Sequence, residues 1–280
     1  MSDIKFYFNG FNEKIVVNDN DRKIEINPYD YKSSTNIDWN KAFSTDDLNY
    51  KLDIIYRIHS AEVINFAPKL NNKNRNVSSK YPLIFVHIPK NAGTSVCDAL
   101  DIKKDSRGHG TLLDIKEEVG SSKFNKYKKV AIVRNPFDRF ISWYFFTKDW
   151  VYNKNSNFNF ESWFWNLDTH VHSVITTMWG KEAWTPTISY PCYNILLNEK
   201  QELDVDYLLR FEHLEEDWKQ MFNDLNIEAP KLPKKNISKN KSNHYSSFYN
   251  CDSGEMIKQF IYDKFKNDFI HFGYKFEKKA

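Results

Sequence analysis

The chain has 280 residues, enough for one large α/β domain, with two small domains less favoured. Its 40 basic and 37 acidic residues give a formal charge of +3, a surplus too small to indicate a nucleic-acid partner. No apolar stretch approaches the ~18 residues of a membrane span, and the N-terminal segment lacks a signal-peptide-like apolar run. Three cysteines without a C-x-x-C pair favour a reducing environment, so we expect a soluble, cytoplasmic protein.

The N-terminal part of the chain reads as short strands and turns. Residues 1–43 contain IKFYF, EKIVV and RKIEI, separated by Asn, Asp and Gly clusters. A helix is expected to begin near Ser44, and the polar stretch 67–80 is expected to be a surface connection. We therefore expect an N-terminal extension, 1–80, packed on a main domain, 81–280. The strands of the extension either cover a sheet edge or form a dimer contact.

The main domain begins with a strand that runs into a polar loop. The apolar run LIFV at 83–86 is typical of a parallel strand covered on both faces. The loop HIPKNAG follows, and a helix is expected to begin near Thr94 and Ser95. Such a loop points backbone N–H groups and the Lys90 ammonium at the space above the helix start, which predicts an anion site. It is not a Walker A loop, because Lys90 precedes Gly93 instead of standing directly before the hydroxyl.

A second strand-to-helix junction follows the run VAIV at 130–133. Pro136 suits the first turn of a helix. Arg134 ends the strand, where ligands of open α/β sheets bind, and its planar guanidinium can hold a phosphate with two hydrogen bonds. Ser142 follows about two helical turns later. Two anion sites on neighbouring units suit a ligand with phosphate groups at both ends.

Further elements complete the expected fold. YLLRF at 207–211 predicts a third strand, with Glu212 capping the helix that follows, and a last helix is expected to be capped by Asp252. The helix after the third strand has one apolar face, formed by Leu214, Trp218, Met221, Phe222 and Leu225. Alternating strands and helices predict an α/β fold, a P-loop-like three-layer sandwich with a central, mostly parallel sheet flanked by helices.

Together the two junctions resemble the sulfotransferases of the carbohydrate type that use 3′-phosphoadenosine-5′-phosphosulfate (PAPS). IPKNAGTS at 88–95 matches the loop that grips the 5′-phosphosulfate in that family. RNPFDRFISWY at 134–144 matches the signature that holds the 3′-phosphate. LLRFEHLEEDW at 208–218 and DFIHFGY at 268–274 also look like this family, in the same order. The resemblance covers about residues 82–276.

The resemblance implies an in-line transfer of a sulfuryl group from PAPS, without a metal, to a hydroxyl or an amine of a glycan or of a small metabolite. Lys90 would stabilise the charge that develops as sulfur leaves, and Arg134 and Ser142 would hold the 3′-phosphate. The loop residues that would hold the 5′-phosphate are Asn91, Ala92, Gly93, Thr94 and Ser95. A basic loop late in the chain adds Lys239 and Lys241 as candidates for nucleotide binding.

An acceptor hydroxyl needs a general base, and histidine is the usual choice near neutral pH. His109, in a glycine-flanked loop, is the preferred candidate. His87 is the rival, although its place at a strand end favours a structural role. Some family members carry H-G-H where this chain has Arg107-Gly108-His109, so Arg107 is a candidate for holding an acidic group of the acceptor. Arg139 either binds the 3′-phosphate or braces its helix.

Two other classes stay open at this point. A nucleotide kinase or NTPase would need magnesium-dependent ATP turnover, which the lysine position disfavours. A binding protein that has lost catalysis is kept open by the departure at Arg107. His170 and His172 do not indicate a metal site, because they alternate in direction and have no ligand partners at metal-site spacing. The tryptophan-rich stretch 149–186 is expected to shape the acceptor site.

Overall fold

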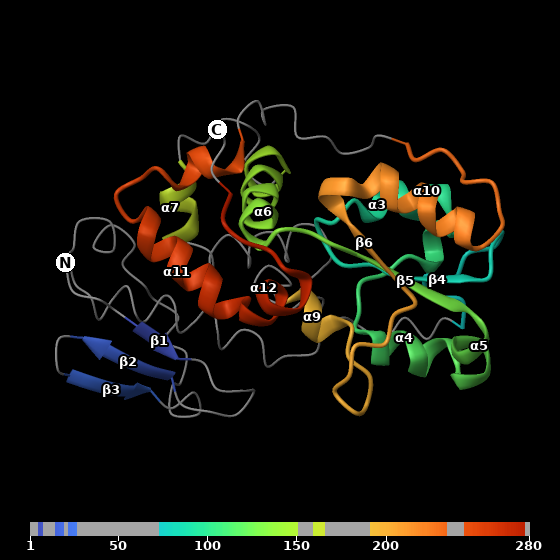
Figure 1. Ribbon diagram of the computed structural model, residues 1–280, viewed down its shortest axis with the longest axis horizontal. Coiled ribbons are helices and arrows are strands. Elements are labelled where there is room, and N and C mark those ends of the chain that lie inside the picture. Colours follow the sequence, from blue (N-terminus) through green and yellow to red (C-terminus); the bar gives the residue numbers. More distant parts are fainter. Residues whose placement is uncertain are drawn as a thin grey trace.

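The structure is a computed structural model, and it describes residues 5–7, 15–19, 22–26, 73–150, 159–165, 191–233 and 244–277. Its main sheet contains β4 (Leu83–Val86), β5 (Lys128–Val133) and β6 (Tyr207–Arg210). The strands are parallel and lie in the order β4-β5-β6 (Figure 1). The strands β4 and β6 lie within predicted runs, and β5 contains the predicted run at 130–133, so the three predicted strands are confirmed.

Helices cover both faces of this sheet (Figure 1). The helices on one face are α3 (Gly93–Ala99) and α10 (Leu214–Asp224). The helices on the other face are α4 (Leu112–Val119), α5 (Ser121–Lys126) and α9 (Cys192–Ile195). The predicted three-layer α/β architecture is therefore confirmed.

Side-chain alternation along the strands produces two separate cores. Leu83 and Phe85 of β4 pack with α3 and α10, whereas Ile84 and Val86 pack with α4, α5 and α9. All four side chains are fully buried, as expected of a strand covered on both faces. The inner face of α10 matches the prediction, with Trp218, Met221 and Phe222 buried and Leu214 and Leu225 packed beside them.

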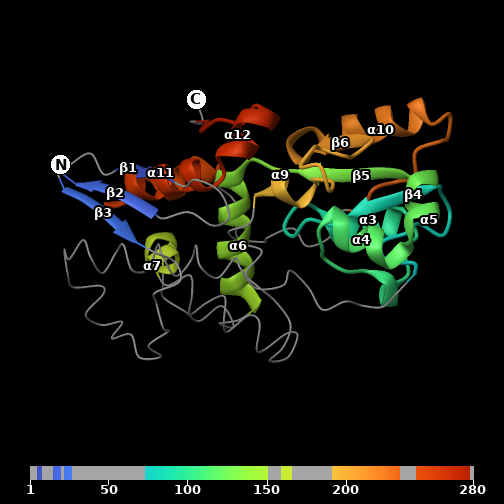
Figure 2. The same ribbon diagram turned by 90° about the horizontal axis from the view of Figure 1, so that it is seen from below.

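A third core, largely aromatic, surrounds the helix that follows β5. This helix is α6 (Pro136–Trp150). Around it lie α7 (Phe160–Trp165), the 3-10 helix η5 (Tyr245–Tyr249), α11 (Gly254–Lys264) and α12 (Lys266–Phe272) (Figure 2). The predicted buried stripe of α11 is confirmed at Ile257, Phe260, Ile261 and Phe265. Trp163, from the tryptophan-rich stretch, is fully buried and belongs to this core.

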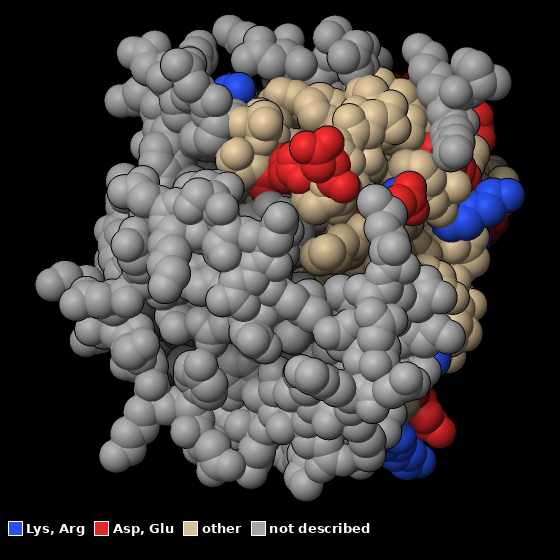
Figure 3. Space-filling view, turned by 90° about the vertical axis from the view of Figure 1, so that its left-hand side faces the viewer, with Lys and Arg blue, Asp and Glu red and all other residues tan. Residues whose placement is uncertain are grey.

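The remaining elements are short. They are η2 (Lys104–Ser106), η4 (Phe211–His213) and an antiparallel sheet of β1 (Lys5–Tyr7), β2 (Ile15–Asp19) and β3 (Arg22–Ile26). These three strands confirm the N-terminal prediction, and β1 lies beside α11 (Figures 1 and 2). The helix expected near Ser44 lies outside the described residues. Where side chains are described, the end of the molecule near α7 and α11 is mainly uncharged, with scattered acidic and basic groups (Figure 3).

No helix in the described ranges is both long and apolar enough to cross a membrane.

The prediction that residues 67–80 form a surface connection is wrong for the second half of this stretch. Arg75 is 1% exposed and Asn76 is fully buried. Val77 forms an isolated bridge with Ile84, and the backbone N–H of Phe85 donates to the Asn76 carbonyl. The segment is polar yet buried because it runs along β4 and its polar groups find hydrogen-bond partners there. The division at residue 80 itself stays a prediction.

The two predicted helix caps, Asp252 for the last helix and Glu212 for the helix after the third strand, are not found in the structure. Helix α11 begins after Ser253, whose backbone N–H donates to Glu161 of α7 over 2.7 Å, so Asp252 is not its cap. Glu212 accepts hydrogen bonds from the backbone N–H of Asn135, before α6, and from the Tyr274 hydroxyl, and does not cap α10. Both predictions were wrong because tertiary packing brings these helix starts to distant carboxylates.

Substituting Glu161 tests this assignment. Glu161→Ala should lower the free energy of unfolding by about 1.5–3 kcal/mol, because the start of α11 loses a charged hydrogen-bond acceptor. Asp252→Ala, the matched control, should change it by less than about 0.5 kcal/mol. Urea denaturation measures both values. An equal or larger loss for Asp252→Ala would restore the original cap assignment.

Candidate functional site

The loop between β4 and α3 is a tight turn anchored on the neighbouring strand. Lys90 and Ala92 have φ angles of 69° and 59°, in the left-handed region, which costs non-glycine residues about 1 kcal/mol each. Hydrogen bonds to its backbone and side chains offset this cost. Asn91 Nδ2 donates to the Ile132 carbonyl of β5 over 2.7 Å, and Arg134 Nη1 donates to the Lys90 carbonyl over 2.7 Å.

Gly93, at the start of α3, is needed for close approach. A Cβ atom on this residue would lie 1.8 Å from His87 Nε2, far inside the contact distance. The His87 ring packs beside Phe85, with ring centroids 5.4 Å apart, and beside His109, at 4.1 Å. The loop glycine thus lets the first turn of α3 settle on the His87 imidazole.

Arg134 joins the two predicted anion sites. Its side chain is buried, with Nε and Nη2 at 2.8 Å and 2.7 Å from Asp138 Oδ2. The guanidinium also lies over the Phe211 ring, 3.9 Å from its centroid. Together with its bond to the Lys90 carbonyl, these contacts place the start of α6 directly against the loop. Ser142 lies further along the same helix and is half-buried.

The Lys90 side chain also rests on α6. Its ammonium lies 4.0 Å from the centroid of the Phe146 ring and 5.5 Å from that of Trp143. Aromatic faces attract cations, so these rings stabilise the ammonium where the loop meets the helix. Sequence reasoning missed this contact, although the spacing of Trp143 and Phe146 places them on one helix face.

His109 is held in a defined tautomer. Its Nδ1 lies 3.0 Å from the His87 carbonyl, which can only accept, so Nδ1 carries the proton and Nε2 the lone pair. The pKa of His109 is lowered to about 4, chiefly by burial and also by the charges of Arg75, Lys90 and Arg139, while the bond to the His87 carbonyl acts in the opposite direction. His109 is therefore neutral at pH 7, the form that a general base needs.

The pKa of His87 is also lowered well below its usual value, first by burial and then by the charges of His109 and Arg107. Its ring lies against Gly93 and Phe85, as a structural role requires.

The remaining predicted residues brace the loop and its helix. Arg139 is buried, and its Nε donates to the Pro89 carbonyl over 3.2 Å. Arg107 Nη2 lies 2.7 Å from Asp98 of α3, and its Nε donates to the Ile102 carbonyl. Lys239, Lys241, His170 and His172 lie outside the described residues.

Asp268, which opens DFIHFGY, was not singled out from the sequence. It is buried and accepts hydrogen bonds from the backbone N–H groups of Cys192 and Tyr193, at 2.9 Å and 2.7 Å. Burial raises its pKa to about 6, against the effect of these bonds and of the Arg139 charge. Asp268 thereby ties α12 to the start of α9, whose Cys192 contacts Asn91 of the loop.

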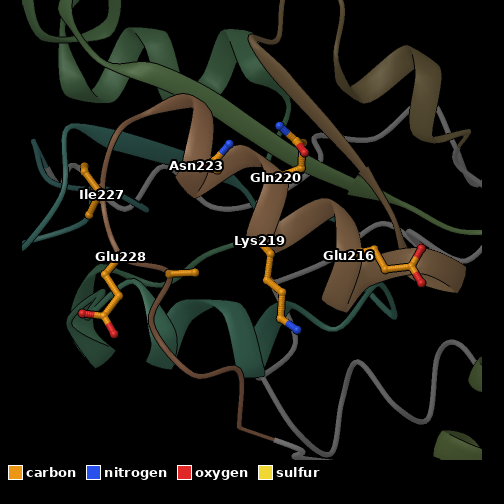
Figure 4. A pocket seen from close by; sticks show the side chains of 7 residues that line it. Glu216, Lys219, Gln220, Asn223, Ile227 and Glu228 are labelled. Atoms are coloured by element: carbon orange, nitrogen blue, oxygen red, sulfur yellow. The ribbon is translucent and has the colours of Figure 1, made fainter.

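A surface depression on the described part of the chain lies apart from this loop. It lies between the outer face of α10 and residues 227–229, and its lining includes Glu216, Lys219, Asn223 and Glu228 (Figure 4). The lining mixes charges of both signs and bears no histidine. Within the described ranges, no three His, Cys, Asp or Glu side chains gather as metal ligands would.

The protein is thus an α/β protein in which the loop predicted to bind an anion lies at the carboxyl end of a parallel sheet. A scan against protein-family models matches residues 73–275 to the sulfotransferase family. Because the match spans more than half of the chain, the protein belongs to the sulfotransferase family, whose members transfer sulfuryl groups. Searches of curated proteins and of solved structures found no match. The matched range includes the buried segment beside β4, which begins at Arg75.

The protonation of His109 is directly measurable. Its imidazole should stay neutral from pH 8 down to about pH 4, because burial disfavours the cation. Since the unfolded chain takes up this proton near pH 6.5, stability should be full above that pH and fall as the pH drops toward 4. Histidine ¹⁵N NMR titration, assigned with His109→Gln, gives the value. A midpoint near 6.5 would show that His109 is not held as described.

The fit between Gly93 and His87 can be tested by a double-mutant cycle. Gly93→Ala should cost about 1–3 kcal/mol of unfolding free energy, because the new methyl group overlaps the imidazole. His87→Ala removes the overlapping ring, so the double variant should lose less than the sum of the two single losses. Strictly additive losses in denaturant titrations would contradict the packing.

Proposed function

We propose that this protein transfers a sulfuryl group from PAPS to a hydroxyl of a glycan acceptor, with His109 as general base. The observation that supports this proposal best is the hydrogen bond between Arg134 and the Lys90 carbonyl. This bond brings the loop that resembles a 5′-phosphosulfate site against the helix that resembles a 3′-phosphate site. PAPS carries one anionic group at each of these positions.

The residues around the loop fit such a donor. The first N–H groups of a helix have no partner within the helix, so the start of α3 offers donors to a phosphate, beside the hydroxyls of Thr94 and Ser95. Arg134 and Ser142 of the β5–α6 junction would hold the 3′-phosphate. When bound, PAPS supplies the sulfuryl group that is transferred.

The protein contributes charge stabilisation and a proton acceptor. Lys90, held beside α6 by aromatic rings, would stabilise the negative charge that grows on the phosphate oxygen as its bond to sulfur breaks. His109 would take the proton of the acceptor hydroxyl at Nε2, because Nδ1 is occupied by its own proton and the His87 carbonyl.

The acceptor side rests on the sequence alone. A small-metabolite acceptor is the second candidate, and the cytoplasmic location stays a prediction. The tryptophan-rich stretch expected to shape this site lies largely outside the described residues.

Nucleotide binding tests the donor. Calorimetric titration should show that 3′,5′-ADP binds without magnesium and much more tightly than ATP. Ser142→Ala should raise the dissociation constant of 3′,5′-ADP about 10-fold, the effect of a lost hydrogen bond to a charged group. Ser122→Ala, at an exposed serine of α5, is the matched control and should leave affinity unchanged. Ser142 is preferred to Arg134, whose removal would leave Asp138 buried without its cation.

Tight ATP binding that requires magnesium, with no competition from 3′,5′-ADP, would overturn the donor assignment and favour a kinase.

A further inference from the structure

The loop that carries His109 is held by two consecutive residues from the segment before β4. The Asn76 side chain makes a double contact with Gly108: Nδ2 donates to the Gly108 carbonyl over 2.7 Å, and Oδ1 accepts from its N–H over 2.9 Å. Arg75 Nη2 donates to the His109 carbonyl. Both side chains are essentially buried, at 0% and 1% exposure, so water does not compete for these bonds.

Arg75 is itself fixed from the opposite side. Its Nη1 lies 2.5 Å from Glu118 Oε1 of α4, and these two side chains are 1% and 5% exposed. A buried ion pair is costly to break, because separating it leaves a charge in a poorly solvating interior. Gly110 passes close to the guanidinium, since a Cβ atom there would lie 2.8 Å from Arg75 Nη2. Arg75 thus fills the inside of the loop.

Asn76 is tied to the main sheet through its backbone. Its carbonyl accepts from the N–H of Phe85 in β4 over 2.9 Å, and its own N–H donates to the Ser106 carbonyl over 2.7 Å. Its φ angle of 53° lies in the left-handed region, which asparagine tolerates better than most residues. Asn76 therefore connects the His109 loop to β4, the strand that also leads into His87.

Without such support, the loop would have little reason to keep one conformation. Glycine residues flank His109 on both sides and lose more conformational entropy on ordering than any other residue. The bond from His109 Nδ1 to the His87 carbonyl contributes only about 1 kcal/mol net, comparable to the cost of fixing one backbone residue. The bonds from Arg75 and Asn76 provide the remaining restraint.

We propose that Arg75 and Asn76 form a clamp that positions His109 against the His87 carbonyl and thereby fixes its Nδ1–H tautomer, which leaves the lone pair on Nε2. Neither residue is assigned contact with substrate, so both are positioning residues. The functional meaning of the clamp rests on the proposed role of His109 as general base. The clamp itself is a claim about the imidazole and can be tested without a substrate.

Histidine ¹⁵N NMR reads the clamp directly, because the two nitrogen shifts report the tautomer. In the wild type, His109 should be almost entirely Nδ1–H. Asn76→Gly keeps the left-handed backbone and removes both bonds to Gly108, so the Nε2–H tautomer should become the major form and the His109 pKa should rise toward 6.5. Asn76→Asp, which keeps the acceptor and loses the donor, should fall between them and serves if Asn76→Gly folds poorly.

Asn198→Ala is the matched control. The Asn198 side chain also accepts backbone N–H bonds that hold a loop, from Lys200 and Glu202, but it has no contact with the His109 loop. This variant should leave the His109 tautomer and pKa unchanged. If Asn76→Gly and Asn76→Asp both keep the wild-type tautomer and pKa of His109, the proposal of a clamp is wrong.

Titration of 3′,5′-ADP into the same variants separates this proposal from the proposed function. Affinity for 3′,5′-ADP within about 2-fold of the wild type, together with a changed His109 tautomer, supports a clamp that acts on the base alone. A 10-fold loss of affinity that accompanies the tautomer change would show a general collapse of the site and overturn the clamp. A wild type that does not bind 3′,5′-ADP would sink the donor assignment, while the NMR result would still decide the clamp.

Discussion

The geometry of the site depends on the hydrogen bonds and the ion pair made by the buried guanidinium of Arg134. This guanidinium is shared between Asp138 of α6, the helix that follows Arg134, and the Lys90 carbonyl of a loop 44 residues earlier. A cation removed from water must keep its partners, so the distance between loop and helix has little freedom. The Lys90 ammonium reaches the same helix at Phe146. The Lys90 carbonyl is thus held by the residue before Asn135 and Pro136 at the start of α6, and the Lys90 ammonium contacts α6 itself.

The hydrophobic cores on either side hold the loop and α6 rigidly in this arrangement. The main sheet is covered on both faces and fixes the starting points of the loop and of α6. The aromatic core then holds α6 along its length, with Phe140 packed edge-to-face on Phe265. Close packing of this kind has few voids, so small displacements of one layer are resisted by the others.

Local patterns predicted the strands and most helix faces, because apolar periodicity and strand-end position are properties of short segments. The residues that hold the site in place have no such local sequence pattern. Arg75 and Asn76 lie in a polar, irregular stretch whose burial depends on β4 and α4. Glu161 and Glu212 serve helices that are distant in the sequence. Gly93 looked like a residue for phosphate approach, but the ring it admits in the structure is that of His87.

The position of the clamp along the chain has a mechanical consequence. Arg75 and Asn76 stand shortly before β4 in the chain, and Asn76 is hydrogen-bonded to Phe85 of that strand. A displacement of β4 would therefore reach the His109 loop through Asn76, whereas the loop between β4 and α3 has additional anchors on Ile132 of β5 and on Arg134. Under the proposed function, the proton acceptor and the donor site would thus be held by different parts of the chain.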